Sequence, residues 1–395
     1  KTSLVKERFV KEIQKNPDNL IYSDLLIWLF VQKKDFEAAF IQCRAIDKRL
    51  RENGRRLIEL ARTAMSNEQY EVGRKAYQYV IDKGPGELYF QARKELSLAL
   101  YRRLVNSNAY TPAELEELYS LLKRTQYEIG GGEPSAPIAI RLAHLVAFYQ
   151  EKPDSALQIL EPYLSDLSLP TRLLNEVKLE AADIQLLQGE IWEATLTYSQ
   201  VEKAMKNDTL GQEAKFRNAK LAYYKGEFEW AKAQLDILKA ATSKLIANDA
   251  LELSLLIADN TVYDSTGEAL RMFSRADLCL YQNKPEKALD TLDSLMHGLP
   301  GSTLADDILY RKALISVRQG RYSEAISFCE QLLAAYRTDI LADNALFLMA
   351  GLYEKQLNTP SKAMELYKEL ISEFPGSLFV VEARKRFRTL RGDAL

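Results

Sequence analysis

Residues 319–332 read "QGRYSEAISFCEQL", and this stretch decides the fold because its pattern recurs along the chain. A turn containing Gly or Asn is followed by a small residue and, four positions later, by a large one, here Ala325 and Cys329. Residues four apart share one face of a helix, so the pattern predicts a helix that closely approaches a neighbour. Clear copies are "QGEIWEATLTYSQV" (188–201), "KGEFEWAKAQLDIL" (225–238), "QNKPEKALDTLDSL" (282–295) and "LNTPSKAMELYKEL" (357–370).

The small residues return at a nearly constant interval. From Ala156 the steps are 38 residues to Ala194 and 37 to Ala231; from Ala288 they are 37 to Ala325 and 38 to Ala363. A second small residue stands twelve positions before several of these. It predicts a partner helix that crosses the first at close range, and its copies are Ala182, Ala219, Ala276 and Ala313. Ala350 stands thirteen positions before Ala363, one residue further away. The chain is therefore predicted to repeat a helix-turn-helix unit.

This unit resembles the tetratricopeptide repeat family: a small residue in helix A, Gly in the turn, Ala and Tyr in helix B, and Pro at the close. The resemblance is strong over residues 170–390 and weaker before them, although the unit is longer than the usual length of about 34 residues. The closings "LPGSTLADD" (299–307) and "FPGSLFVVEARKRF" (374–387) are similar to those of outer-membrane assembly lipoproteins and the periplasmic cell-division coordinator of bacteria. The resemblance implies an all-α fold, a right-handed α-solenoid of about nine units.

We expect N-terminal repeats over residues 1–127, a loop or hinge at 128–137, and C-terminal repeats with a capping helix over 138–395. The loop contains three consecutive glycines but no following Lys-Ser/Thr, which favours a hinge over a phosphate-binding loop. The 57 residues from Ala231 to Ala288 exceed one unit. We predict that 245–260 forms an extra helix A, and that 261–281 serves both as its partner and as the next helix A. Residues 4–19 match a helix B without its helix A, so we expect further repeats upstream.

Composition bounds the function. The net charge of −2 argues against a basic nucleic-acid surface. Only two histidines occur, His144 and His297, and we expect helix-interface packing for the first and a helix-end contact for the second. The three cysteines are far apart, no catalytic or nucleotide-binding motif is present, and no apolar run could span a bilayer. We therefore expect no enzyme activity, cofactor, metal or small-molecule substrate.

The family resemblance predicts that helices A line a protein-binding groove. The predicted groove residues are Phe216, Arg217, Lys220, Tyr223, Tyr224, Asp307, Tyr310, Arg311, Arg318 and Asn344. Outward-facing aromatic and arginine side chains are typical of binding hot spots. For Tyr223 and Tyr224, packing against the next helix is an equal alternative.

An acid or amide doublet recurs in "IANDALELSLLI" (246–257), "LADDILYRKALI" (304–315) and "LADNALFLMAGL" (341–352). Acids near a helix start complement the helix dipole, and Thr303 with Asp306 has capping-box spacing, so we interpret the doublet as a helix start rather than a metal site. Ser302 with Thr303 can supply the cap of the second copy, and Ser243, or Thr338 with Asp339, the caps of the other two. At the C-terminus, Arg384, Arg388 and Arg391 share a face, as in a solvated cap or a phosphate-binding surface.

The leading hypothesis is a non-enzymatic scaffold that binds proteins or peptides within a bacterial cell-envelope assembly. It would lie in the periplasm or on the periplasmic face of the outer membrane, with the cytoplasm as the alternative. Membrane contact would be indirect or through an anchor that precedes this sequence. A helical-repeat nucleic-acid binder is the second hypothesis, and an enzyme built on a helical superhelix is the third.

Overall fold

The computed structural model describes residues 2–17, 19–86, 88–106, 110–241, 244–261, 267–299 and 302–393. Every regular element in these ranges is an α-helix, 21 in all, which confirms the predicted all-α solenoid of tetratricopeptide units. The chain divides into two compact units, Lys1–Val177 (unit 1) and Lys178–Leu395 (unit 2). The division falls inside α10 (Thr171–Gln188), whereas the hinge at 128–137 stays a prediction.

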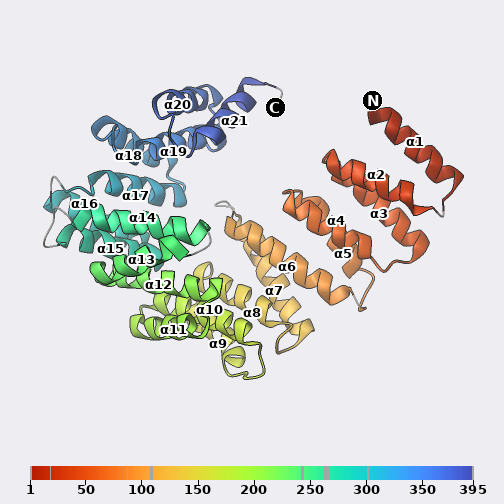
Figure 1. Ribbon diagram of the computed structural model, residues 1–395, viewed down its shortest axis with the longest axis horizontal. Helices are drawn as coiled ribbons and strands as arrows, with labels where there is room; N and C mark the ends of the chain where they lie inside the picture. The colour runs from red at the N-terminus through yellow and green to blue at the C-terminus, as the bar shows by residue number, and fades with distance from the viewer. Residues whose placement is uncertain are drawn as a thin grey trace. The chain divides into compact units, whose positions relative to one another are not determined.

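Unit 1 stacks its helices in chain order, red to yellow in Figure 1. They are α1 (Thr2–Lys15), α2 (Leu20–Gln32), α3 (Phe36–Leu50), α4 (Arg55–Ser66), α5 (Tyr70–Ile81), α6 (Tyr89–Asn106), α7 (Pro112–Ile129), α8 (Ala136–Phe148) and α9 (Pro153–Leu164). The turn from α7 to α8 contains two glycines with positive φ, Gly130 and Gly132. It ends at the buried Ser135, whose hydroxyl bonds that of Tyr163 at 2.8 Å.

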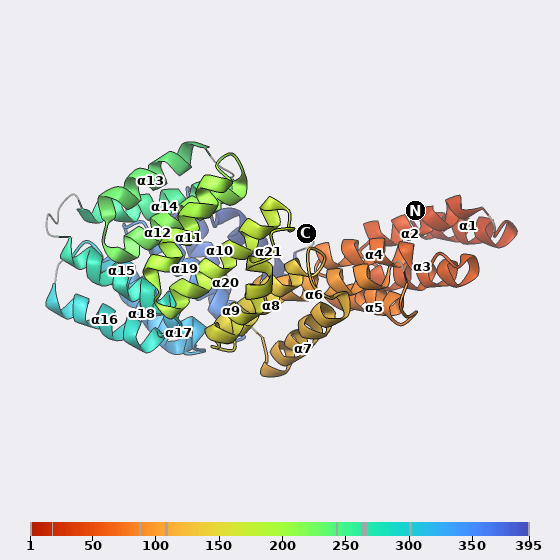
Figure 2. The ribbon, with the colours of Figure 1, turned by 90° about the horizontal axis from the view of Figure 1, so that it is seen from below.

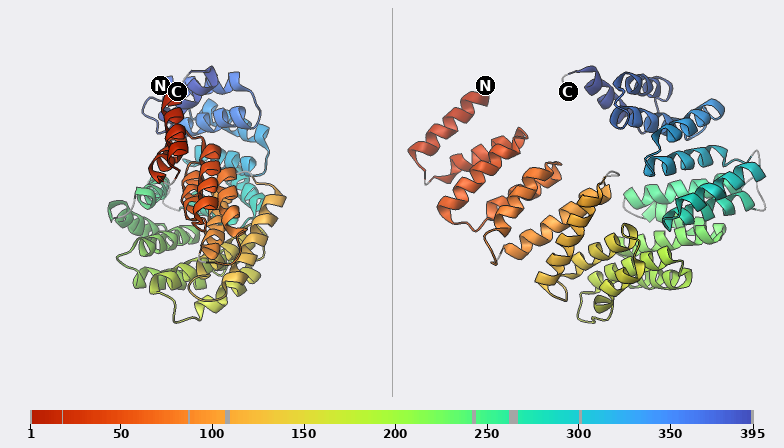
Figure 3. Two further views of the ribbon diagram at one scale, coloured as in Figure 1. Left: turned by 90° about the vertical axis from the view of Figure 1, so that its right-hand side faces the viewer. Right: turned by 180° about the vertical axis from the view of Figure 1, so that it is seen from behind.

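Unit 2 is likewise a stack of helices, green to blue in Figure 3. Its helices are α11 (Ile191–Ala204), α12 (Thr209–Lys225), α13 (Phe228–Ala241), α14 (Lys244–Thr261), α15 (Glu268–Tyr281), α16 (Pro285–Gly298), α17 (Ala305–Arg318), α18 (Tyr322–Ala335), α19 (Ala342–Lys355), α20 (Pro360–Glu373) and α21 (Val380–Arg391). No described helix in either unit is both long enough and apolar enough to cross a membrane.

The helices pair as the repeat predicts. Leaving out α1, α14 and α21, the other 18 described helices form nine consecutive A–B pairs, α2–α3 to α19–α20. The repeated small residues lie where helices cross. The following are all 0% exposed: Ala182, Ala194, Ala219, Ala231, Ala276, Ala288, Ala313, Ala325, Ala350 and Ala363. A larger side chain at these positions would separate the helices, which explains the strict spacing of small residues.

Apart from the turn between α6 and α7, which includes residues outside the described ranges, each A-to-B turn places one residue in the left-handed region of φ. Glycine or asparagine occupies it in the later repeats, because these residues adopt positive φ with the least strain. In unit 1 the same position is filled by Lys34, Glu68 and Glu151, with φ of 58°, 61° and 56°. The weaker match of the early repeats to the family pattern thus includes their turns, although the backbone conformation is the same.

The structure corrects the prediction for residues 245–281. α14 packs mainly against α13, as Figure 2 shows, and only weakly against α15. α15 instead packs against α12 and forms an A–B pair with α16. α14 is therefore an additional helix without α15 as its partner, whereas the prediction that this segment supplies the next helix A is confirmed by α15. Residues 262–266 of the predicted partner helix lie outside the described residues.

The doublets lie near helix starts, but the caps predicted for α17 and α19 are wrong. α17 begins after Leu304 without a side-chain cap, because the Thr303 hydroxyl bonds Asn260 of α14 instead of the backbone of α17. α19 likewise begins after Leu341 without a side-chain cap. Ser243, the expected cap for α14, lies outside the described residues. Among the described residues, no three His, Cys, Asp or Glu side chains are grouped to hold a metal ion.

Candidate protein-binding face

Successive A helices of unit 2 bring charged side chains into one layer. We call this layer the charged face and define it by Asp183 of α10, Arg217 and Lys220 of α12, Asp277 of α15 and Arg311 of α17. Asp183, Lys220 and Asp277 each follow directly after the small residue of their helix. This shared position is why neighbouring helices place them side by side.

Arg217 is held by two carboxylates. It pairs with Asp183 from the preceding A helix and with Glu213 one turn earlier on α12. Burial alone would lower the pKa of Arg217, but the charges of Asp183 and Glu213 raise it, so the guanidinium stays protonated. Tyr198 of α11 donates its hydroxyl to the same Asp183 carboxylate at 2.6 Å.

The same arrangement recurs two repeats along the stack, between α15 and α17. The Arg311 Nε lies 3.1 Å from the Asp277 Oδ1, and the Tyr223 hydroxyl donates to Asp277 Oδ2 at 3.0 Å. Arg217 and Asp183 are 34 residues apart, and so are positions 311 and 277. The guanidinium of Arg311 also lies 5.6 Å from the centre of the Phe273 ring. An aspartate on one A helix thus pairs with an arginine on the next.

Lys220 is the exception in the charged face. It is half-buried, and within the described chain it forms no ion pair or hydrogen bond; its Nζ lies 5.9 Å from the centre of the Tyr224 ring. Burial lowers the pKa of Lys220, and the positive charge of Arg311 lowers it further. The negative charges of Asp277, Asp249 and Asp183 raise this pKa but do not cancel the effect of burial.

Asp307 is an acid near the charged face that, like Lys220, has no ion-pair partner among the described residues. It is half-buried in the first turn of α17, and no residue in the described ranges bonds its carboxylate. Burial raises its pKa to about 7, and the nearby charges of Asp306, Asp277 and Asp259 act in the same direction, opposed by Arg311. This carboxylate therefore changes charge near neutral pH.

The remaining predicted groove residues divide into two groups. Phe216, Tyr310 and Asn344 are half-buried, and a side-chain hydrogen bond links Tyr310 to Asn344; Arg318 is exposed. Tyr223 and Tyr224 are buried, at 1% and 6% exposure. They pack between α12 and α15, so the packing alternative describes them and they cannot contact a partner directly.

Sequence reasoning missed Asp183, Asp277 and Tyr281. The Tyr281 hydroxyl donates to the backbone carbonyl of Asp183 at 3.1 Å, and its ring lies 6.3 Å from that of Tyr224. The signal was available: these three residues occupy, in α10 and α15, the positions that Lys220 and Tyr224 occupy in α12.

A tyrosine–carboxylate–arginine triad joins helices in three repeats of the described chain. In each, the tyrosine four residues after the small residue of helix B donates to a carboxylate on one A helix, and an arginine on another helix pairs with that carboxylate. The triads are Tyr77–Glu95–Arg62, Tyr198–Asp183–Arg217 and Tyr367–Glu354–Arg386. This explains why tyrosine recurs in helix B.

We expect Tyr198→Phe to lower the free energy of unfolding of unit 2 by about 1–2 kcal/mol, because the half-buried Asp183 carboxylate loses a hydrogen bond. Urea denaturation with hydrogen-exchange mass spectrometry would measure the change. Tyr127→Phe is the control, since Tyr127 is 87% exposed. Equal effects of the two changes would contradict the structural role of the triad.

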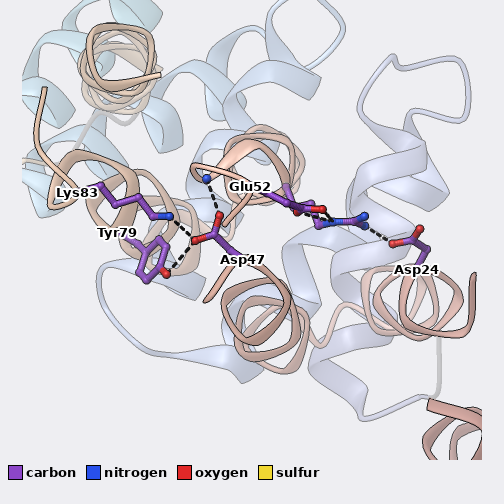
Figure 4. A network of polar contacts seen from close by, with 7 residues as sticks. Asp24, Asp47, Glu52, Tyr79 and Lys83 are labelled. Atoms are coloured by element: carbon purple, nitrogen blue, oxygen red, sulfur yellow. Dashed lines mark hydrogen bonds and ion pairs between the residues drawn. The ribbon is translucent and has the colours of Figure 1, made fainter. Parts of the chain in front are cut away.

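Unit 1 contains a second polar network, shown in Figure 4. The Asp47 carboxylate, 1% exposed, accepts the backbone N–H of Gly54 at 2.6 Å, the Tyr79 hydroxyl at 3.0 Å and the Lys83 ammonium. Burial alone would raise the pKa of Asp47, but these hydrogen bonds lower it below its usual value. The network fixes the turn between α3 and α4.

Next to this network is a shallow pocket of about 360 Å³ between α2, α3 and α4. Arg56 crosses its edge, pairing with Asp24 of α2 and with Glu52 at 2.7 Å (Figure 4). The Cys43 thiol at its floor is buried, and burial raises its pKa to about 12, so it stays protonated. No predicted groove residue lies here.

The histidines and the terminal arginines have ordinary surroundings. His144 stacks on Phe148 with ring centres 4.5 Å apart, and His297 is exposed with its Nδ1 2.7 Å from the Asp293 carbonyl oxygen. α21 packs on α20. Its Arg384 and Arg388 are exposed, while Arg391 Nε donates to Asp393 at 2.9 Å. Phosphate binding by this helix stays a prediction.

Family models described as tetratricopeptide repeat match residues 273–340 and 344–377. These matches fall on repeats that the structure resolves as A–B helix pairs with buried small residues at their crossings. Residues 273–340 and 344–377 are therefore tetratricopeptide repeats. Such repeats imply a protein-interaction scaffold.

Comparisons of the whole chain add only distant likenesses. No curated protein matches by sequence. Among solved structures, the human IFIT1 dimer with m7Gppp-AAAA is 14% identical, with 93% of this chain and 84% of that chain covered and a TM-score of 0.35. A tetratricopeptide repeat protein from Parabacteroides merdae is 15% identical, with 76% of this chain and 99% of that chain covered and a TM-score of 0.30. PilW, a widely conserved type IV pilus biogenesis factor, is 12% identical, with 75% of this chain and 99% of that chain covered and a TM-score of 0.32. Such values carry no argument about partners.

Proposed function

We propose that unit 2 is a non-enzymatic scaffold that binds segments of partner proteins across its charged face. The observation that carries this proposal is the pair of half-buried, unpaired charges, Lys220 and Asp307, in a layer where the arginines are already paired. A half-buried charge without a partner is unfavourable. A bound polypeptide that supplies the missing partners would remove that cost.

The half-buried side chains around these charges fit the same role. Phe216 packs on the edge of the unit 2 core, and Tyr310 and Asn344 extend the layer to α17 and α19. Aromatic groups beside charges that become desolvated on binding are typical of the centre of an interface.

The finer part of the proposal is that this scaffold belongs to a bacterial cell-envelope assembly, in the periplasm or on the periplasmic face of the outer membrane. The similarity of the repeat closings at 299–307 and 374–387 to envelope proteins supports it. Fractionation of cells expressing the native gene tests it: the protein should remain with the envelope fraction, and recovery in the cytosol would refute this placement.

Site-specific photo-crosslinking tests the binding face. A photoreactive residue at Asn344 should crosslink to a discrete partner, and Lys220→Glu should lower the crosslinked yield about tenfold, because it places a like charge opposite the partner's acid. Lys203→Glu is the matched control, since Lys203 is exposed on α11. Crosslinks unaffected by Lys220→Glu, or equally strong from position 203, would show that the face does not bind.

A further inference from the structure

α14 has one face that the repeat stack uses and one that it leaves open. Its inner face is buried against α13, where Ser254 donates to Asp236 at 2.8 Å and Lys239 donates to Ser254 at 3.3 Å. Ala250 and Ile257 are 0% and 1% exposed. α15 packs on α12 past this helix, so the A-helix contacts of the repeat are made without α14.

The outer face of α14 combines aliphatic and acidic side chains. Leu251 and Leu255, one turn apart, are each 43% exposed. Glu252 and Asp259 are exposed beside them, and Asp249 lies further around the same open side. An exposed leucine pair on a helix that the stack does not require indicates a contact surface rather than a packing element.

The acidic edge of α14 extends the charged face. The charge of Asp249 acts on Lys220 of α12, and that of Asp259 acts on Asp307 of α17. At the end of α14, the Thr303 hydroxyl before α17 donates to Asn260. α14 is thereby positioned beside the same A helices that carry the charged face.

Carboxylates outnumber cations in this combined surface. Arg217 and Arg311 are already neutralised by Asp183 and Asp277, which leaves Lys220 as the unpaired cation. Against it stand five acids: Asp249, Glu252, Asp259, Asp306 and Asp307. A partner complementary to this surface must therefore supply mainly positive charge, with an acid only opposite Lys220.

We propose that the outer face of α14, together with Asp307, binds a basic amphipathic segment of a partner protein, with aliphatic side chains on Leu251 and Leu255 and Lys or Arg opposite Glu252, Asp259 and Asp307. The inference rests on the proposed function and names the chemistry of its partner. A helix is the partner conformation that presents aliphatic and basic rows side by side at this spacing.

Binding of such a segment should depend on pH. The groups that face Asp307 are Asp306 and Arg311 on its own helix, Asp277 on α15 and Asp259 on α14. Because the Asp307 carboxyl is protonated below about pH 7, it loses its attraction for a cation there. Affinity for the basic segment should be higher at pH 8 than at pH 6, and Asp307→Asn should remove most of that difference.

The test uses the full chain and a fluorescent helical peptide of lysine and leucine, about 18 residues long, with leucine on one face. Fluorescence anisotropy should show binding that weakens with added salt. Glu252→Gln with Asp259→Asn should weaken it about tenfold, which corresponds to about 1.4 kcal/mol. Both residues are exposed, so the fold should be unaffected.

The matched control is Glu193→Gln with Glu229→Gln, which neutralises two exposed acids on α11 and α13. Peptide binding that is equal in the two double variants, or equally tight binding of a glutamate–leucine peptide, would overturn the inference. The two proposals fail separately. Crosslinks at Asn344 without binding of the basic peptide would leave the scaffold proposal intact and refute this one.

Discussion

Ala219→Leu is expected to destabilise unit 2 by about 3 kcal/mol, at the upper end of what overpacking costs. Ala219 is 0% exposed on α12, in the row of small residues that begins each crossing. Three additional carbon atoms have no space there unless α12 moves away from its neighbours, and that movement would also displace Arg217 from Asp183. The measurement is urea denaturation followed by hydrogen-exchange mass spectrometry on peptides from residues 178–395.

Ala233→Leu serves as the control for this change. Ala233 lies on the open side of α13, where a leucine meets solvent, so the free energy of unfolding should change by less than about 0.5 kcal/mol. A similar loss of stability in both variants would mean that helix propensity or hydrophobic exposure, and not the crossing, sets the effect.

Asp47→Ala is expected to destabilise unit 1 by about 3 kcal/mol, because it removes the acceptor of a buried network. The Gly54 N–H would lose its 2.6 Å hydrogen bond, and Tyr79 and Lys83 would lose their common partner. Lys83 is exposed enough to reach water, which keeps the effect below that of a fully buried ion pair. Hydrogen exchange in residues 36–83 should report the loss.

The same variant has a distinctive pH dependence. The pKa of Asp47 is lowered in the folded chain, so its contribution is present above the unfolded-state pKa of about 4 and is lost as pH falls through the folded value. The stability gap between native protein and Asp47→Ala should therefore be constant near pH 7 and close under strongly acidic conditions. Asp82→Ala, at an exposed acid nearby, should show little gap at any pH.

The repeat architecture could be predicted because steric exclusion acts at fixed positions. Only a small residue fits where two helices cross, so Ala219 and Ala231 mark both helices of one unit in the sequence itself. The small residues also set the register of each helix, and that register predicted three members of the charged face, Arg217, Lys220 and Arg311. Applying the α12 positions to α10 and α15 would also have identified Asp183, Asp277 and Tyr281.

Other features depend on contacts that periodicity does not encode. A helical pattern predicts that 245–260 is a helix, but its packing on α13 depends on the pair Ser254 and Asp236, which no repeat position specifies. Likewise, Thr303 has a capping spacing in the sequence, yet Asn260 competes for its hydroxyl in the fold. The Asp47 network joins residues 32 and 36 positions apart, and its members have no common spacing with the repeat.

The 34-residue step between each aspartate and the arginine it pairs with is the same before and after α14. Sequence added between α13 and α15 has therefore left the rules that join neighbouring repeats unchanged. For an evolving or engineered chain, selectivity for a partner and cohesion of the stack are then under separate control. The outer residues of α14 can be substituted to recognise another ligand while the alanines, aspartates and arginines that assemble the repeats remain unchanged.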